Sequence, residues 1–212
     1  VVPDFDVERE KDALFLINVR NAELHTGDPA MANVPNPKWL PRFIRVADVV
    51  CSHLGVDPAD LVTDDVEAHA RALVDDEDAK TRHEVTTKIS GAKDFYQRLA
   101  APEIQQRTPT LSVGYDWSEW EKVTCPACAT PITMSLIHLR SGAEQIDGDE
   151  VRTDTIWVAD DLECPVCGLH LEGTAEIAAA GLEQQYVRTV TESLEDRYAN
   201  ADEYIDYDYG ND

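Results

Sequence analysis

Two short turns, each carrying a pair of cysteines, are the part of this sequence best suited to do chemistry. The first is Cys125-Pro-Ala-Cys128 and the second is Cys164-Pro-Val-Cys167. Two intervening residues let a turn aim both of its sulfurs at one ion, and four thiolates complete the closed tetrahedral shell of a structural zinc site. The sequence therefore predicts one structural zinc ion per chain, held by all four cysteines.

The residues around the two turns fit this interpretation. Pro126 and Pro165 fix φ directly after the first cysteine of each pair, and Gly168 supplies a permissive backbone just after the last one. The interval over residues 129–163 is longer than the roughly 15–20 residues common between such pairs. We therefore expect a zinc ribbon over residues 123–173 that contains extra strands or an inserted loop.

Two disulfides or a redox-active Cys-x-x-Cys are the competing interpretations of the same cysteines. A disulfide inside either short turn would be strained, and nothing in the sequence indicates an oxidising compartment. A redox role requires cysteines that oxidise reversibly and release no zinc. We expect a cytoplasmic protein whose fifth cysteine, Cys51, is a small core residue on an apolar helix stripe.

The charge of the chain limits its partners. Lys and Arg number 18 against 42 Asp and Glu, which gives a formal net charge of −24. A surface this acidic repels phosphate backbones and anionic lipids at long range, so it disfavours non-specific coating of nucleic acid while leaving room for a local basic pocket. No apolar run approaches the ~18 residues needed to span a bilayer, so we expect no membrane partner. The first residues lack an initiator Met and the basic segment of a signal peptide, so we expect a trimmed chain or a piece of a longer one.

Apolar residues at helical spacing predict a mainly helical N-terminal half. One helix is expected over residues 6–24, and a second over residues 38–54 with an apolar face so broad that it must pack on other helices. These two helices would form a helical part over residues 1–56. Two further helices, separated near the acidic run at residues 75–78, would form a helical extension over residues 57–101.

The character of the sequence changes after the helical extension. Residues 102–122 are expected to form a linker into the ribbon. Residues 132–139 and 155–159 have the composition of ribbon strands. Residues 141–152, rich in Gly and acidic residues, are expected to form an exposed loop between those strands.

A C-terminal helix and an acidic tail complete the expected fold. The helix is predicted over residues 174–199 by an apolar stripe of Ile177, Leu182, Tyr186, Val190 and Leu194. Residues 200–212 are acidic with interleaved tyrosines, and we expect them to be disordered. The predicted fold class is therefore mainly α, with a small β zinc ribbon followed by a C-terminal helix.

A second candidate site lies at the end of the first helix. The segment from Arg20-Asn21 to His25 resembles the Arg-x4-His signature of HEPN-domain ribonucleases, whose common form begins Arg-Asn. The flanking string from Leu16 to Gly27 and the amphipathic helix behind it are also similar to that family, so the resemblance covers residues 5–56. It implies an HEPN-like helical domain that cleaves RNA in a defence or toxin-like system, and a homodimer in which the motifs of two protomers share one cleft.

The side chains of this motif suit RNA hydrolysis without a metal. In that reaction the 2′-hydroxyl attacks the neighbouring phosphate. His25 could move the proton, Arg20 could hold the growing phosphate charge, and Asn21 could orient the group. On a regular helix Asn21 and His25 share a face, whereas Arg20 lies about 140° from His25. Arg20 must therefore bend round the helix, or the helix must end first.

A non-catalytic assembly module is the alternative to a ribonuclease. An exposed Arg and a helix-terminal His are also what favourable helix capping produces, because cations stabilise the C-terminal end of a helix. In this alternative the helical part dimerises through the face between Trp39 and Leu54, and the ribbon docks a protein partner. Acidic residues far outnumber basic ones in the ribbon segment, so nucleic acid is the weaker partner there.

Overall fold

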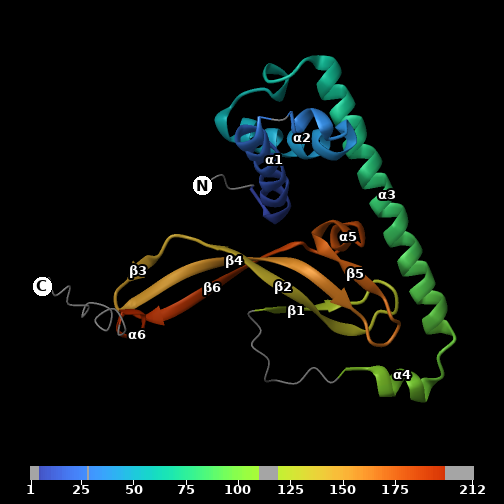
Figure 1. The fold of residues 1–212 in the computed structure, drawn as a ribbon. Helices are drawn as coiled ribbons and strands as arrows, with labels where there is room; N and C mark the ends of the chain where they lie inside the picture. Colours follow the sequence, from blue (N-terminus) through green and yellow to red (C-terminus); the bar gives the residue numbers. More distant parts are fainter. Residues whose placement is uncertain (1–4, 28, 110–118, 199–212) are drawn as a thin grey trace, which may run out of the picture.

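The computed structural model describes residues 5–27, 29–109 and 119–198. It consists of a helical N-terminal unit, one long helix and a curled antiparallel sheet (Figure 1). The helical elements are α1 (Val7–Thr26), η1 (Met31–Asn33), α2 (Asn36–Leu54), η2 (Pro58–Asp60), α3 (Asp64–Gln97), α4 (Ala101–Arg107), α5 (Gly173–Ala179) and α6 (Leu194–Tyr198). The strands are β1 (Trp120–Thr124), β2 (Pro131–Ser141), β3 (Gln145–Asp147), β4 (Glu150–Glu163), β5 (His170–Glu172) and β6 (Gln185–Ser193).

Helix α1 has a capping residue at each end, Asp6 and Gly27. The Asp6 carboxylate accepts a hydrogen bond from the Arg9 backbone N–H at 2.9 Å, which satisfies one of the free donors of the first turn. At the other end Gly27 adopts a left-handed conformation with φ of 74°, and its N–H donates to the Glu23 carbonyl. The helix is therefore regular through His25 and stops directly afterwards.

Helices α1 and α2 meet through an aromatic and ionic contact. The Arg42 guanidinium lies 4.2 Å from the centre of the Phe15 ring and 3.8 Å from the Asp12 carboxylate. On its other side α2 packs against α3, where Leu40 and Ile44 form a small buried cluster with Ala70. Helix α2 is thus the middle layer of the helical unit.

Helix α3 is a single helix of 34 residues, and the prediction of two helices there is wrong. The acidic run at residues 75–78 does not interrupt it, and Arg45 of α2 approaches Glu77 at 2.7 Å and Asp78 at 3.7 Å there. Neither Gly nor Pro occurs between Asp64 and Ser90 to break the helix. At 1.5 Å per residue α3 is about 50 Å long, enough to run from the helical unit past the sheet (Figure 1).

The sheet is organised around β4. Strand β2 pairs with β4 on one side, and β6 and β5 pair with successive parts of β4 on the other, all antiparallel. Strand β1 extends the β2 side, and β3 forms a hairpin with the start of β4. The two cysteine turns lie at one end of this sheet, and the β3–β4 hairpin lies at the other.

The predicted small ribbon underestimates this sheet. Strands β2 and β4 extend well beyond the predicted ribbon strands, and β3 occupies part of the stretch expected to be an exposed loop. The loop prediction failed because Gln145–Asp147 pairs with Glu150–Arg152 across a tight turn. The C-terminal half is thus a six-stranded sheet rather than a minimal zinc ribbon.

The prediction of a C-terminal helix over residues 174–199 is also wrong. The structure has short α5, then strand β6, then short α6 in this region. The stretch holds the β-branched residues Val187, Thr189, Val190 and Thr191, which favour a strand. Pairing with the free side of β4 completes the sheet there, and this long-range contact outweighs an apolar spacing that also matches a helix.

Two separate clusters of buried side chains hold the molecule together, and α3 contributes to both. Ala70 belongs to the cluster shared with α2, whereas Val85 and Ala92 pack on the sheet. The sheet cluster contains the fully buried Met134 and Leu171 and also three of the four turn cysteines. The metal-ligand candidates are therefore part of the core and not an appendage to it.

Some predictions concern residues outside the described ranges. The expected disordered tail at residues 200–212 lies entirely outside them, as does the middle of the expected linker at residues 110–118. The described part of that linker contains α4 and the start of β1. None of the helices in the described ranges is long and apolar enough to cross a membrane.

Candidate functional site

Each cysteine pair occupies the turn of a β-hairpin. Cys125 directly follows β1 and Cys128 lies shortly before β2, while Cys164 follows β4 and Cys167 lies shortly before β5. The two hairpins come from different parts of the sheet, and their turns face each other. Strand pairing thus brings together four residues that are distant in sequence.

The two turns have the same backbone design. In the first, Cys125 N–H donates to the Thr130 carbonyl at 3.0 Å, and in the second, Cys164 N–H donates to the Leu169 carbonyl at 2.9 Å. The residue after the second cysteine is left-handed in both turns, with φ of 58° at Ala129 and 71° at Gly168. The expectation that Gly168 supplies a permissive backbone is confirmed, and Ala129 adopts the same conformation despite its Cβ.

The four sulfurs form a compact cluster that could hold a metal ion. All four Sγ atoms lie within 4.8 Å of one another, and two of the pairs, Cys125–Cys167 and Cys128–Cys164, are 3.6 Å apart. Zinc with thiolate ligands at about 2.3 Å places its sulfurs roughly 3.8 Å apart, close to these separations. The cysteines are free rather than disulfide-bonded. The predicted ligand set is therefore confirmed as a metal-compatible cluster.

The protein environment divides the protons unequally among these thiols. A hydrogen bond with Cys164, helped by the backbone N–H groups of Cys128 and Ala127, lowers the pKa of Cys125 to about 5. The same sulfur contact, together with burial, raises the pKa of Cys164. Burial raises the pKa of Cys167 to about 12. At neutral pH and without metal, the cluster therefore combines thiolate and thiol.

The three residues of the second candidate site are exposed on the last turns of α1. Arg20 and Asn21 line a recess between α1, η1 and α2, whose other lining residues are Leu16, Ile17, Met31, Trp39 and Phe43. His25 is not part of this recess. Across residues 5–27, 29–109 and 119–198, no hydrogen bond or ion pair fixes any of the three side chains.

The structure does not bring Arg20 and His25 together within one chain. Because α1 continues to Thr26, the two side chains leave the helix about 140° apart. Asn21 and His25 do share a face, as their spacing predicts. Glu23, which lies between them in the sequence, accepts a hydrogen bond from Met31 N–H at 3.0 Å and ties η1 to the helix.

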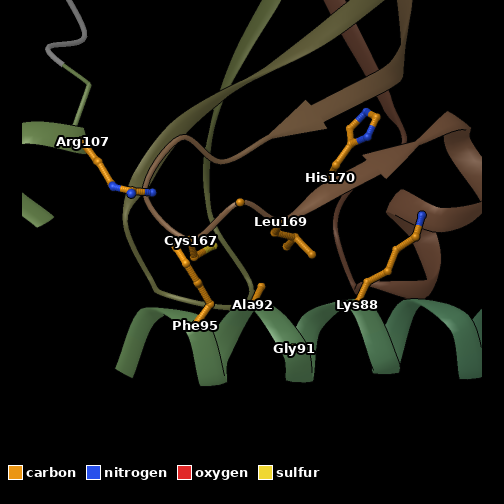
Figure 2. Close-up of a pocket in the computed structure, with 9 residues that line it drawn as sticks. Lys88, Gly91, Ala92, Phe95, Arg107, Cys167, Leu169 and His170 are labelled. Atoms are coloured by element: carbon orange, nitrogen blue, oxygen red, sulfur yellow. The ribbon is translucent and has the colours of Figure 1, made fainter. Parts of the chain in front are cut away.

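A second recess, which sequence reasoning missed, lies between α3 and the second cysteine turn (Figure 2). Lys88 and Phe95 of α3 form one side of it, Leu169 and His170 the other, and Arg107 of α4 one end. These residues come from three segments that are far apart in the chain. No local motif could have identified them.

Comparison of this chain with protein-family models, with curated proteins and with solved structures finds no match. The functional argument therefore proceeds from the geometry of the cysteine cluster, the end of α1 and the two recesses.

Metal loading should release protons. Cys164 and Cys167 have raised pKa values and are thiols at pH 7, yet both must become thiolates to bind a metal. We expect at least two protons per ion at pH 7, one from each of these two residues, and metal affinity that falls as the pH falls. Calorimetry of zinc addition in buffers of different ionisation enthalpy measures this number. Binding without proton release would contradict the environment described for the two thiols.

The two left-handed turn positions should respond in opposite ways to exchange of Gly and Ala. A Cβ at Gly168 meets nothing within 4 Å, so Gly168→Ala adds only backbone strain and should cost about 1 kcal/mol of unfolding free energy. Ala129→Gly removes the corresponding strain and should leave stability unchanged or slightly higher. Urea unfolding of the metal-loaded chains measures both. An equal loss of unfolding free energy in the two variants would contradict the prediction, because Ala129→Gly should relieve backbone strain and not add it.

Proposed function

We propose that this chain is a metal-independent endoribonuclease of the HEPN type, which works as a cytoplasmic homodimer and whose sheet is fastened by one structural zinc ion. The observation that supports the catalytic part most directly is the position of Arg20 and Asn21. Both line a recess next to an exposed apolar stripe on the same helix. A composite site between two protomers requires a catalytic arginine next to the surface through which the two chains dimerise.

Zinc is the metal that best fits the cysteine cluster. Thiolates are soft ligands, and four of them in a tetrahedral arrangement are typical of zinc or of iron–sulfur centres. The separations of 3.6 Å between sulfurs fit a single ion. Four sulfurs leave no position for a substrate, so the ion has a structural role. Free thiols of this kind need a reducing compartment, which supports a cytoplasmic location.

The stripe on α1 supports pairing of two chains. Leu14, Ile17 and Leu24 lie on one face and remain 49%, 51% and 65% exposed. The adjoining recess has Trp39 and Phe43 in its lining, so one surface offers both protruding and receiving apolar groups. A surface with both features can pair with a copy of itself about a two-fold axis. This pairing brings a second Arg20, Asn21 and His25 towards the first set.

A composite site removes the difficulty that Arg20 and His25 of one chain point in different directions. One phosphate can contact Arg20 of one protomer and a histidine from the other, although no single chain aims both at one point. His25 then accepts the proton of the 2′-hydroxyl or donates one to the leaving oxygen. Arg20 stabilises the charge that builds on the phosphate, and Asn21 orients it by hydrogen bonding.

A non-catalytic assembly module is the second candidate. The exposed apolar stripe on α1 favours it equally, because docking alone explains the stripe without any chemistry. In this case the ribbon half presents a protein-binding surface and Arg20 contributes only charge. RNA cleavage separates the two candidates.

Cleavage should depend on the motif and not on metal. We expect structured RNA to be cut in EDTA, leaving 2′,3′-cyclic phosphate ends. His25→Ala should reduce the rate by about 10²–10⁴-fold, as expected for loss of a general acid–base group. Arg20→Ala should reduce it by about 10²–10³-fold through lost charge stabilisation. Gel analysis of end-labelled RNA measures both rates.

His53→Ala is the matched control for this experiment, since His53 also lies in the last turn of a helix and is exposed. It should cleave as the parent does. If the parent chain and all variants are folded and dimeric but none of them cleaves RNA, the ribonuclease proposal is wrong and the assembly module is the better account.

Pairing should depend on the α1 stripe. Ile17→Glu places a charge in the proposed interface and should weaken the dimer by at least about tenfold. Ile146→Glu is the control, because Ile146 is 63% exposed on β3, away from the helical unit. Light scattering after size exclusion, over a range of concentrations, gives the oligomeric state. A parent chain that is monomeric at high concentration, or a dimer indifferent to Ile17→Glu, would contradict the proposed interface.

A further inference from the structure

The recess between α3 and the second cysteine turn has the dimensions of a small-ligand site. Its volume is about 540 Å³, within the range of roughly 300–1,000 Å³ found for such sites. Figure 2 shows Lys88 and Phe95 rising from α3 on one side, with Leu169 and His170 opposite them. We call this recess the α3 groove.

The two ends of the α3 groove differ in charge. At one end the Lys88 ammonium lies 2.6 Å from both carboxylate oxygens of Glu176, and His170 Nε2 lies 2.6 Å from Asp161 Oδ1. At the other end the Arg107 guanidinium lies over the Phe95 ring at 5.4 Å, and no carboxylate within the described ranges forms an ion pair with it. An anionic group therefore has a partner at the Arg107 end. The opposite end offers hydrogen-bond donors and acceptors that are already paired with one another.

The α3 side of the groove is apolar between Lys88 and Phe95. Gly91 exposes bare helix backbone there, and a Cβ at this position would meet nothing within 4 Å. Ala92 and Phe95 continue the apolar surface along α3, with Phe95 36% exposed, and the buried Leu169 faces them from the other side. A planar ring can therefore approach α3 closely. Aromatic and guanidinium planes are the usual partners of nucleobases in single-stranded nucleic-acid sites.

We propose that the α3 groove binds one nucleotide unit, with the phosphate at Arg107 and the base over Gly91 and Phe95. The edge of a base carries both donors and acceptors, which matches the donors and acceptors that Lys88 with Glu176 and His170 with Asp161 present at the other end. An acidic peptide fits less well, because its second carboxylate would meet Glu176 and Asp161. The net charge of −24 likewise favours a ligand with a single anion held locally over a long polyanion.

The nucleotide unit can be free or part of an RNA chain, and RNA as its source rests on the proposed ribonuclease function. In that case the groove holds the substrate at a distance from the motif on α1. Cys167 and Gly168 form part of the groove wall, so the metal centre also shapes this site.

The test is titration of the zinc-loaded full chain with each of the four nucleoside 5′-monophosphates, followed by amide chemical shifts. We expect saturable binding of at least one, with shifts at Gly91, Phe95 and Leu169, and weaker binding of inorganic phosphate. Arg107→Gln should weaken binding by about tenfold through loss of a charge-assisted hydrogen bond. Gly91→Leu should abolish it by filling the groove, without lowering the melting temperature, because Leu favours a helix more than Gly does.

Ser90→Leu is the matched control, since Ser90 is an exposed neighbour on α3 that does not line the groove. It should bind as the parent does. A fluorescent RNA oligonucleotide displaced by the monophosphate identifies RNA as a source, whereas monophosphate binding with no effect on the oligonucleotide identifies a free nucleotide. Because binding is measured without cleavage, an inactive ribonuclease leaves this test intact.

Three results would overturn the proposal. They are the absence of saturable binding by both monophosphates and oligonucleotide, binding unaffected by Gly91→Leu, and inorganic phosphate binding as tightly as the nucleotides. A short acidic peptide is the comparison ligand. If this peptide binds the groove and no monophosphate does, the groove is a site for a protein partner and not for a nucleotide.

Discussion

The contact between four cysteine sulfurs is the interaction on which the C-terminal half depends. Each hairpin turn supplies only two ligands, and the four sulfurs of the β1–β2 and β4–β5 turns lie within 4.8 Å of one another. A structural zinc ion bound by such turns contributes about 10–16 kcal/mol at neutral pH. That is comparable with the net stability of a whole domain, about 5–15 kcal/mol. The proposed ion would therefore decide whether this end of the sheet is folded.

Helix α3 connects the sheet to the helical unit because it packs on both. It carries Val85 and Ala92 into the sheet cluster and Ala70 into the cluster with α2, and Lys88 adds an ion pair to Glu176 of α5. Helix α1 is held more weakly, since no residue along Val7–Thr26 is fully buried. A helix with so little burial in its own chain has low local stability unless another surface covers it. This property agrees with the proposed pairing through α1.

The cysteine cluster could be predicted from sequence because its cause is local. The spacing of Cys125 and Cys128 fixes the turn, four thiols are a ligand set that suits zinc, and Gly168 marks the left-handed position. The helices α1 and α2 were likewise predictable from apolar periodicity. Strand β6 was not, because its apolar positions also fit a helix and only the free side of β4 decides between them.

Other features were hidden because they depend on contacts between distant segments. The packing of α2 on α3 includes an ion pair between Arg45 and Glu77, which are 32 residues apart in the chain. The α3 groove combines residues from α3, α4 and the second turn, each unremarkable in its own sequence context. The position of the Arg20–His25 motif on α1 was predicted correctly, but spacing alone could not show whether the side chains converge. In one chain they do not, and this is why the proposed ribonuclease requires two.

X-ray absorption at the zinc edge of the purified chain tests the central claim most directly. The account predicts one zinc per chain with four sulfur ligands at about 2.3 Å and no nitrogen or oxygen ligand. A mixed shell with nitrogen or oxygen would contradict it, because the ligand set would then differ from Cys125, Cys128, Cys164 and Cys167. A folded, metal-free chain with these cysteines paired as disulfides would contradict it equally.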